Sequence, residues 1–218
     1  MKTAVIFDLD GTLIDSAPDI HATANAVLAL HGFAALSLAQ VRGFVGRGVP
    51  HLVARLLEAS GADPEGPLHA EMVCEFNDRY VDAVTLTVLY PGVRETLEAL
   101  AAAGHPLAIC TNKPVAPTEA VLSHFGLLPL FAAVVGGDSL PQRKPDPAPL
   151  HQAHFLLGKP PALFVGDSEI DAETAERAGF GFALFTEGYR HTAVQDLPHR
   201  VAFNDFAMLP GIVAQWGA

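Results

Sequence analysis

The 218-residue chain has few basic residues, few cysteines and no long apolar run, and each shortage excludes a class of protein. Its 13 lysines and arginines stand against 24 acidic residues, a net charge of −11, whereas a nucleic-acid partner requires clustered positive charge. Two cysteines, Cys74 and Cys110, do not suggest a disulfide framework. No apolar stretch is long enough to span a membrane, and Asp8 comes too early for a signal peptide. We therefore expect a soluble cytoplasmic protein with no nucleic-acid and no membrane partner.

The residues that are abundant describe a globular chain in which strands and helices alternate. Half of the residues are hydrophobic and 17% are charged, which is the composition of a folded protein. Short apolar runs predict five buried strands, and segments with helical spacing lie between them. The predicted strands are Ala4–Leu9, Pro106–Cys110, Ala132–Val135, Ala162–Val165 and Gly181–Phe185. The predicted helices are Val93–Ala103, Pro117–Phe125, Pro147–Leu157 and Asp171–Ala178. This alternation predicts an α/β fold with a parallel sheet covered by helices on both faces.

One long segment, residues 17–85, departs from the alternation because no strand is predicted in it. Its stretches of helical spacing are Ile20–Leu30, Val49–Ala59 and Leu68–Ala83. We therefore expect an α-helical domain inserted into a core made of residues 1–16 and 86–218. The chain crosses between the two near Ile14–Pro18 and Thr85–Pro91, which are the expected hinges.

Polar side chains follow the predicted strands at four places. Since ligands of open α/β sheets bind at the carboxyl ends of the strands, these side chains are expected to converge on one edge of the sheet. They are Asp8 and Asp10 at the end of the first strand, Thr111 and Asn112 after the second, Lys144 in the loop after the third, and Asp167 and Asp171 after the fourth. Each segment alone has an ordinary explanation as a turn, a cap or a loop. Their order and their common place at strand ends favour one active site.

The combination of groups suits phosphoryl transfer. Asp8 is expected to attack phosphorus and form an acyl-phosphate. Asp10, two residues further on, is expected to protonate the leaving group and then to activate the water that hydrolyses the intermediate. The Thr111 hydroxyl and the Lys144 ammonium are expected to contact the transferring phosphoryl oxygens, where charge develops.

Two carboxylates would repel a phosphate dianion, so this chemistry requires a bound cation. Oxygen ligands suit Mg²⁺. We expect Asp8, the carbonyl of Asp10 and Asp167 to hold the ion, with Asp171 next to these ligands.

Four segments resemble the motifs of a known superfamily. Phe7–Leu13, Thr111–Asn112, Lys144 and Gly166–Asp171 are similar, in this order, to the four motifs of the haloacid dehalogenase-like (HAD) hydrolases. The resemblance extends from about Lys2 to Phe185. It implies a Rossmann-like core, a helical cap inserted after the first motif, and dependence on Mg²⁺.

Single features separate the chemistries of this superfamily. Dehalogenases lack an acid at the position of Asp10, so carbon–halogen cleavage is disfavoured. Phosphonoacetaldehyde hydrolases use a lysine of the cap, and residues 17–85 contain no lysine. β-Phosphoglucomutases typically have Val-Glu-Asp-Ser where this chain has Val165–Ser168. The phosphoglycolate phosphatases are more similar, in Asp15–Asp19, Val45–Val49, Thr111–Pro114 and Lys144–Pro147.

This resemblance implies a small anionic phosphate ester as substrate, 2-phosphoglycolate, hydrolysed to glycolate. The expected substrate-binding residues are Gly11, Thr12, Asn112, Arg47 and Gly48. Gly11 allows close backbone approach, and the N–H groups as far as Thr12 suit anionic oxygen. Arg47, in a glycine-rich loop, is expected either to pair with the substrate carboxylate or to be a solvated arginine. Lys113 either adds a polar contact or points to solvent.

Other functions share much of this pattern. One is a β-phosphoglucomutase-like phosphosugar mutase, and another is a broad sugar-phosphate phosphatase or pyrophosphatase of the same superfamily. A third is not an enzyme but a receiver-like switch, in which a partner phosphorylates Asp8. Asp10 and the helical insertion argue against the switch, which needs neither an acid nor a lid. The sequence leaves the oligomeric state open.

Overall fold

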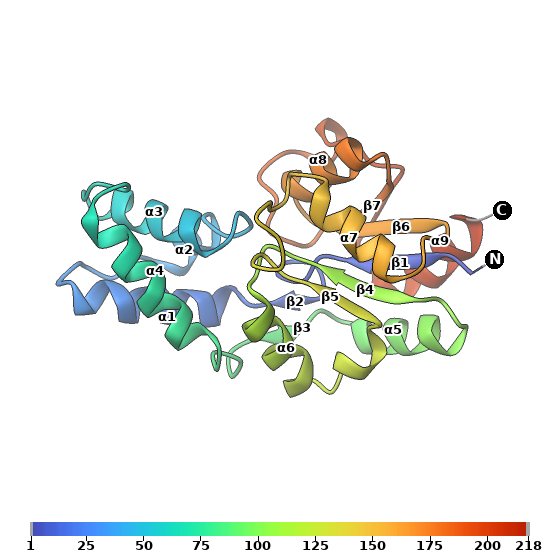
Figure 1. Ribbon diagram of the computed structural model, residues 1–218, viewed down its shortest axis with the longest axis horizontal. Coiled ribbons are helices and arrows are strands. Elements are labelled where there is room, and N and C mark those ends of the chain that lie inside the picture. Colours follow the sequence, from blue (N-terminus) through green and yellow to red (C-terminus); the bar gives the residue numbers. More distant parts are fainter. Residues whose placement is uncertain (1, 217–218) are drawn as a thin grey trace.

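The apolar segments that end in polar residues form a six-stranded parallel sheet in the computed structural model, which describes residues 2–216 (Figure 1). Every neighbouring pair of strands is parallel. In spatial order the strands are β5 (Ala133–Val135), β4 (Leu107–Cys110), β1 (Ala4–Phe7), β6 (Ala162–Gly166), β7 (Gly181–Phe185) and β8 (Val201–Phe203). The predicted α/β fold with a Rossmann-like core is confirmed, and β8 is an addition that the sequence did not indicate.

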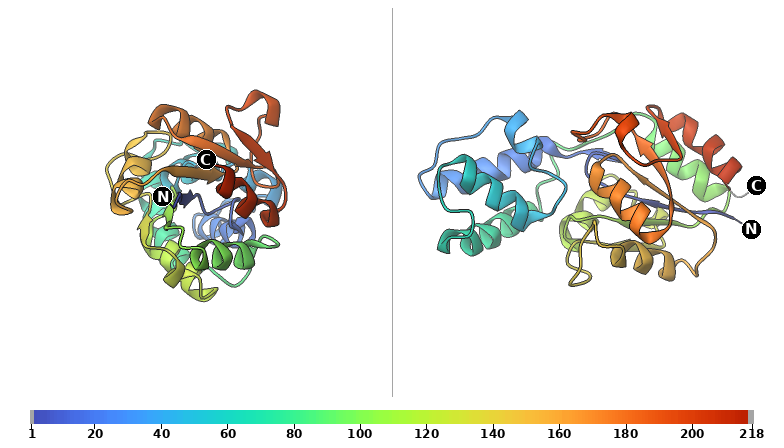
Figure 2. Two further views of the ribbon diagram at one scale, coloured as in Figure 1. Left: turned by 90° about the vertical axis from the view of Figure 1, so that its right-hand side faces the viewer. Right: turned by 90° about the horizontal axis from the view of Figure 1, so that it is seen from above.

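Helices cover both faces of the sheet because successive residues of each strand point to opposite faces. Val5 and Phe7 of β1 pack in one apolar cluster and Ile6 packs in a second. The first cluster includes residues of the helices that follow β3 (Val88–Leu89), β4 and β8, and the second includes residues of the helices that follow β5 and β6. The two layers are visible in Figure 2. The helices are α5 (Val93–Ala102), α6 (Val115–His124), α7 (Ala148–Leu156), α8 (Glu169–Ala178) and α9 (Leu209–Trp216). Short 3₁₀ turns occupy Leu128–Leu130, Val194–Asp196 and Phe206–Met208.

Four helices follow the first strand and form a separate helical block. They are α1 (Ala17–Leu30), α2 (Leu38–Arg42), α3 (Val49–Ala59) and α4 (Pro67–Tyr80). The block has its own apolar core, which contains Val27, Val53, Met72 and Phe76, all fully buried. In Figure 1 it stands at the left, with the two chain termini at the opposite end of the molecule. Three of its helices match the segments of helical spacing, and α2 is an addition to them.

The chain enters and leaves the helical block through one pair of short strands. β2 (Ile14–Asp15) and β3 (Val88–Leu89) are antiparallel partners. Next to them, the carboxylate of Asp19 accepts hydrogen bonds from the backbone N–H and the hydroxyl of Thr87, both at 2.7 Å. Both predicted crossings therefore lie side by side and are fastened to each other. None of the helices within residues 2–216 is long and apolar enough to cross a membrane.

Candidate active site

The polar residues that follow the strands do come together at one edge of the sheet. Lys144, from the loop between β5 and α7, places its ammonium 2.8 Å from Asp8 Oδ1 and 2.6 Å from Asp171 Oδ1. Asp8 directly follows β1, and Asp171 lies in the first turn of α8. Residues separated by more than 130 positions in the sequence thus share one ion-pair network.

Burial and charge shift the pKa values in this network. Desolvation raises the pKa of Asp8 from 3.8 to about 7, although Lys144 opposes the shift. Burial alone would lower the pKa of Lys144, but the carboxylates of Asp171 and Asp8 raise it above its ordinary value. The lysine therefore stays an ammonium and is a fixed positive charge beside Asp8.

Three buried carboxylates form a cluster that fits a divalent cation. Asp8, Asp167 and Asp171 offer oxygen atoms that all lie within 4.8 Å of one another. Burial, together with the charges of Asp171 and Asp8, raises the pKa of Asp167 well above 3.8. Lys144 contacts Asp8 and Asp171, and within residues 2–216 no basic side chain forms an ion pair with Asp167. An all-oxygen donor set with excess negative charge suits a hard cation such as Mg²⁺.

The turn after β1 supports this carboxylate cluster. The Thr12 hydroxyl, which is fully buried, donates to Asp167 Oδ1 at 2.8 Å. Gly11 has φ of +91°, and a Cβ atom there would lie 2.6 Å from Asp167 Oδ2. Only glycine fits this position. Thr12 thus holds Asp167 and Gly11 leaves room for its carboxylate; direct contact of either residue with a substrate stays a prediction.

Asn112 fastens three segments of the site to one another. Its Nδ2 atom donates to the carbonyl oxygens of Gly46 and Lys144, each at 2.9 Å, and its Oδ1 atom accepts from the backbone N–H of Lys144 at 3.0 Å. Its neighbour Thr111 is buried and lines the same cavity as Asp8. These hydrogen bonds of the Asn112 side chain all go to backbone groups of the protein, so its expected contact with the substrate stays a prediction.

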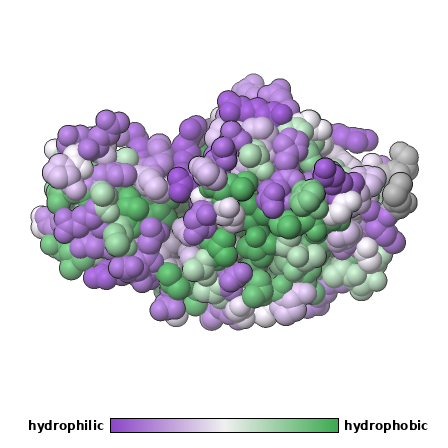
Figure 3. Space-filling view, in the orientation of Figure 1, coloured by the Kyte–Doolittle hydropathy of each residue, from purple (hydrophilic) through white to green (hydrophobic). Residues whose placement is uncertain are grey.

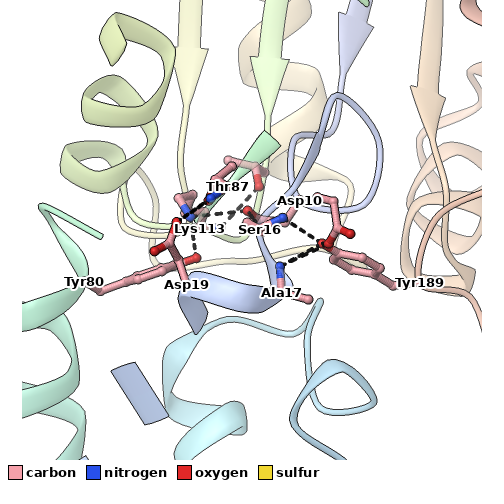
Figure 4. A network of polar contacts seen from close by, with 10 residues as sticks. Asp10, Ser16, Ala17, Asp19, Tyr80, Thr87, Lys113 and Tyr189 are labelled. Atoms are coloured by element: carbon pink, nitrogen blue, oxygen red, sulfur yellow. Dashed lines mark hydrogen bonds and ion pairs between the residues drawn. The ribbon is translucent and has the colours of Figure 1, made fainter. Parts of the chain in front are cut away.

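Asp10 is held by the side chains of Ser16 and Lys113. Its Oδ1 atom accepts from Ser16 Oγ at 2.6 Å and from Lys113 Nζ at 3.2 Å. Lys113 also donates to the hydroxyl of Tyr80, which comes from α4 of the helical block (Figure 4). Burial lowers the pKa of Lys113, and the charge of Asp10 opposes this shift. Lys113 is therefore an interior residue, and the alternative that it points to solvent is wrong.

Tyr189 is a further part of the site without a sequence signal. Its hydroxyl accepts from the backbone N–H groups of Ser16 at 2.8 Å and Ala17 at 3.0 Å, and donates to Asp15 at 2.7 Å. Its own backbone N–H donates to Asp167 Oδ2 at 2.6 Å. Tyr189 thus connects the start of α1 to the carboxylate cluster. It lies after β7, beyond the last segment with a recognisable motif.

Two cavities open beside Asp8 and Asp10, where the helical block meets the core. The apolar cavity has a volume of about 40 Å³ and is lined by Ile20, Val45, Val49, Leu52 and Phe76 from the helical block, by Gly46, Gly48 and Tyr80, and by Thr111, Asn112 and Lys113. The polar cavity, of about 170 Å³, is lined by Arg47, His51 and His191 among others. Figure 3 shows the two lobes, with hydrophilic residues over much of the surface where they meet. Of the two expected cap residues, Gly48 thus borders the first cavity and the exposed Arg47 borders the second.

Known proteins resemble this chain over nearly its whole length. The family model described as "Hydrolase: haloacid dehalogenase-like hydrolase" matches residues 2–179. A Rhodobacter capsulatus protein named "Phosphoglycolate phosphatase" is 52% identical over 99% of each chain, and a Cereibacter sphaeroides protein of the same name is 54% identical over 96% of each. The crystal structure of a predicted phosphoglycolate phosphatase from Haemophilus somnus has a TM-score of 0.90 and 33% identity, with 97% of each chain covered. The chain therefore belongs to the haloacid dehalogenase-like hydrolase family.

Proposed function

We propose that this protein is a magnesium-dependent phosphatase that hydrolyses 2-phosphoglycolate to glycolate and inorganic phosphate through a phosphorylated Asp8. The observation that carries the proposal is the buried Asp8 carboxylate, paired with Lys144 at 2.8 Å and bordering a cavity of only about 40 Å³. The relatives named phosphoglycolate phosphatase, at 52% and 54% identity, support the choice of substrate.

Asp8 acts as the nucleophile. Its carboxylate attacks phosphorus, the bond to the leaving oxygen breaks, and an acyl-phosphate forms. Lys144 and the Thr111 hydroxyl stabilise the negative charge on the phosphoryl oxygens. Asp8, the Asp10 carbonyl and Asp167 would hold Mg²⁺, with Asp171 next to them, and the ion supplies positive charge that lets a phosphate dianion approach the carboxylates.

Asp10 acts as general acid and then as general base. Its Oδ1 atom is occupied by Ser16 and Lys113, and among residues 2–216 no side chain or backbone group donates to its Oδ2 atom. We assign the proton transfer to Oδ2, which gives a proton to the leaving oxygen and later removes one from the attacking water. The two donors on Oδ1 fix the orientation of the carboxylate for both steps.

The helical block, taken as residues 17–85, acts as a cap over the core of residues 1–16 and 86–218. Its separate apolar core and its attachment through β2 and β3 support this division. The apolar cavity beside Asp8 is small, about 40 Å³, which supports a cap that favours small leaving groups. We expect a two-carbon leaving group to be preferred over a sugar in this space.

A phosphate-release assay with a panel of esters, with and without Mg²⁺, tests the proposal. We expect kcat/KM to be highest for 2-phosphoglycolate, above hexose phosphates and pyrophosphate. The Asp8→Asn variant should lose at least about 1,000-fold in kcat, because the nucleophile is gone. The exposed Asp78→Asn substitution is the matched control and should leave kcat unchanged.

Each rival function has a distinct outcome in this assay. A sugar phosphate that is preferred, or that is converted to an isomer with its phosphate retained, would contradict the proposed substrate. An active Asp8→Asn variant would contradict the mechanism. Phosphorylated Asp8 that persists without turnover would indicate a switch rather than an enzyme.

A further inference from the structure

We propose that Lys113 is the residue that binds the substrate carboxylate and so makes the enzyme specific for a phosphorylated hydroxy acid. This inference rests on the proposed function, since it takes Asp8 and Asp10 as the reacting groups. It assigns to Lys113 a role separate from its contact with Asp10.

One N–H donor of the Lys113 ammonium has no hydrogen-bond acceptor within the described residues. Lysine carries three N–H donors and no acceptor. One contacts Asp10 Oδ1 at 3.2 Å, and a second contacts the hydroxyl of Tyr80 (Figure 4). Within the described part of the chain, no third acceptor contacts Nζ. Nζ also lies 3.9 Å from the centre of the Tyr80 ring. The side chain is only 6% exposed and borders the apolar cavity, so a ligand in that cavity is placed to supply a third hydrogen-bond acceptor.

The distance from Lys113 to the reacting atoms suits a short hydroxy acid. To protonate the leaving oxygen, Asp10 must lie within about 3 Å of it. Lys113 Nζ lies 3.2 Å from Asp10 Oδ1, so the ammonium and the leaving oxygen would both contact the Asp10 carboxylate. In 2-phosphoglycolate a single CH₂ group separates the leaving oxygen from the carboxylate. The carboxylate of this substrate is therefore expected to lie within reach of Nζ.

The charges around the cavity favour the same assignment. Lys113 is the only basic residue among those that line the apolar cavity, and its charged neighbours there, Asp8 and Asp10, are both negative. A substrate carboxylate in this cavity needs a positive partner. Arg47 is the competing candidate, but it is exposed and lines the polar cavity instead.

A pair of substrates separates carboxylate binding from the support of Asp10. 2-Phosphoglycolate and ethyl phosphate have leaving groups of similar length, and only the first carries a carboxylate. Lys113→Met should lower the ratio of kcat/KM for 2-phosphoglycolate over ethyl phosphate by about 10- to 100-fold, the usual effect of losing a hydrogen bond between charged groups. Arg47→Met should leave this ratio unchanged. The exposed Lys159→Met substitution is the matched lysine control, and both substrates should be hydrolysed at the wild-type rate.

The outcomes distinguish this inference from the proposed function. If Lys113→Met slows both esters equally, Lys113 acts only through Asp10 and the inference is wrong, while the phosphatase function stands. A fall in the ratio for Arg47→Met alone would overturn it in the same way. If the wild-type protein hydrolyses neither ester, the proposed function fails and the inference fails with it. Should Lys113→Met not fold, Lys113→Gln removes the charge with a smaller change in polarity, and the same fall in the ratio is expected.

Discussion

Removing the hydroxyl of Tyr189 tests how the helical block is attached to the core. It accepts hydrogen bonds from the N–H groups of Ser16 and Ala17 at the start of α1 and donates to Asp15. Tyr189→Phe removes the oxygen and leaves the ring in place. The N–H of Ala17 keeps a longer contact with Asp15 at 3.3 Å. The N–H of Ser16 is buried and has no other recorded acceptor within residues 2–216.

The expected loss of stability follows from these contacts. A buried donor left without a partner costs about 1 to 3 kcal/mol, and a weakened hydrogen bond adds about 0.5 to 1 kcal/mol. We therefore expect Tyr189→Phe to lower the free energy of unfolding by about 2 to 3 kcal/mol. With a urea m-value of about 2.5 kcal/mol/M, the midpoint of urea unfolding should fall by about 1 M.

Tyr90 supplies the control, because its buried hydroxyl has no hydrogen-bond partner in the described structure. Tyr90→Phe removes an unpaired polar atom and should leave the free energy of unfolding unchanged or raise it by about 1 kcal/mol. Urea unfolding, followed by circular dichroism, compares the two variants with the wild type. A midpoint for Tyr189→Phe within error of the wild type would refute the reasoning. So would an equal loss in Tyr90→Phe, since the effect would then not depend on hydrogen bonding.

Three further predictions concern the site and the two thiols. Gly11→Ala should reduce kcat about 100-fold, because its Cβ atom would displace the Asp167 carboxylate, whereas Gly32→Ala, with a similar φ and open space around it, should retain full activity. A chelator should abolish phosphate release, and added Mg²⁺ should restore it. Asp167→Asn should raise the Mg²⁺ concentration needed for half-maximal activity at least about tenfold. An unchanged Mg²⁺ requirement would show that Asp167 is not a ligand. The exposed Cys74 should react with a thiol reagent in the native protein. Cys110, whose pKa burial raises to about 12, should react only after unfolding. Rapid reaction of both thiols in the native protein would contradict the burial of Cys110.

The sheet and the meeting of polar side chains at one of its edges were predictable because their signals are local. The apolar run before Asp8 and the polar residues that directly follow β4 and β6 mark the strand ends without any knowledge of the partners. The rule that ligands bind at those ends then brings Lys144 and Asp171 to Asp8, where the structure has them.

The remaining parts of the site depend on contacts between distant residues. Lys113 is interior and contacts Tyr80 of α4, 33 positions away in the sequence. Tyr189 meets Ser16 from 173 positions away. β2 and β3 have two residues each, too few for any periodicity to appear. No pattern in one segment can report such contacts, because tertiary packing creates them.

The β2–β3 pair has a consequence for how lids of different specificity could arise on this core. Both ends of the insertion leave the core as adjacent strands, about 5 Å apart, as hydrogen-bonded strands always are. Any segment whose own ends form such a pair could replace the present one without a change in the sheet or in the polar residues at its edge. The core can therefore stay the same while a different lid changes the shape and charge of the space that the leaving group enters.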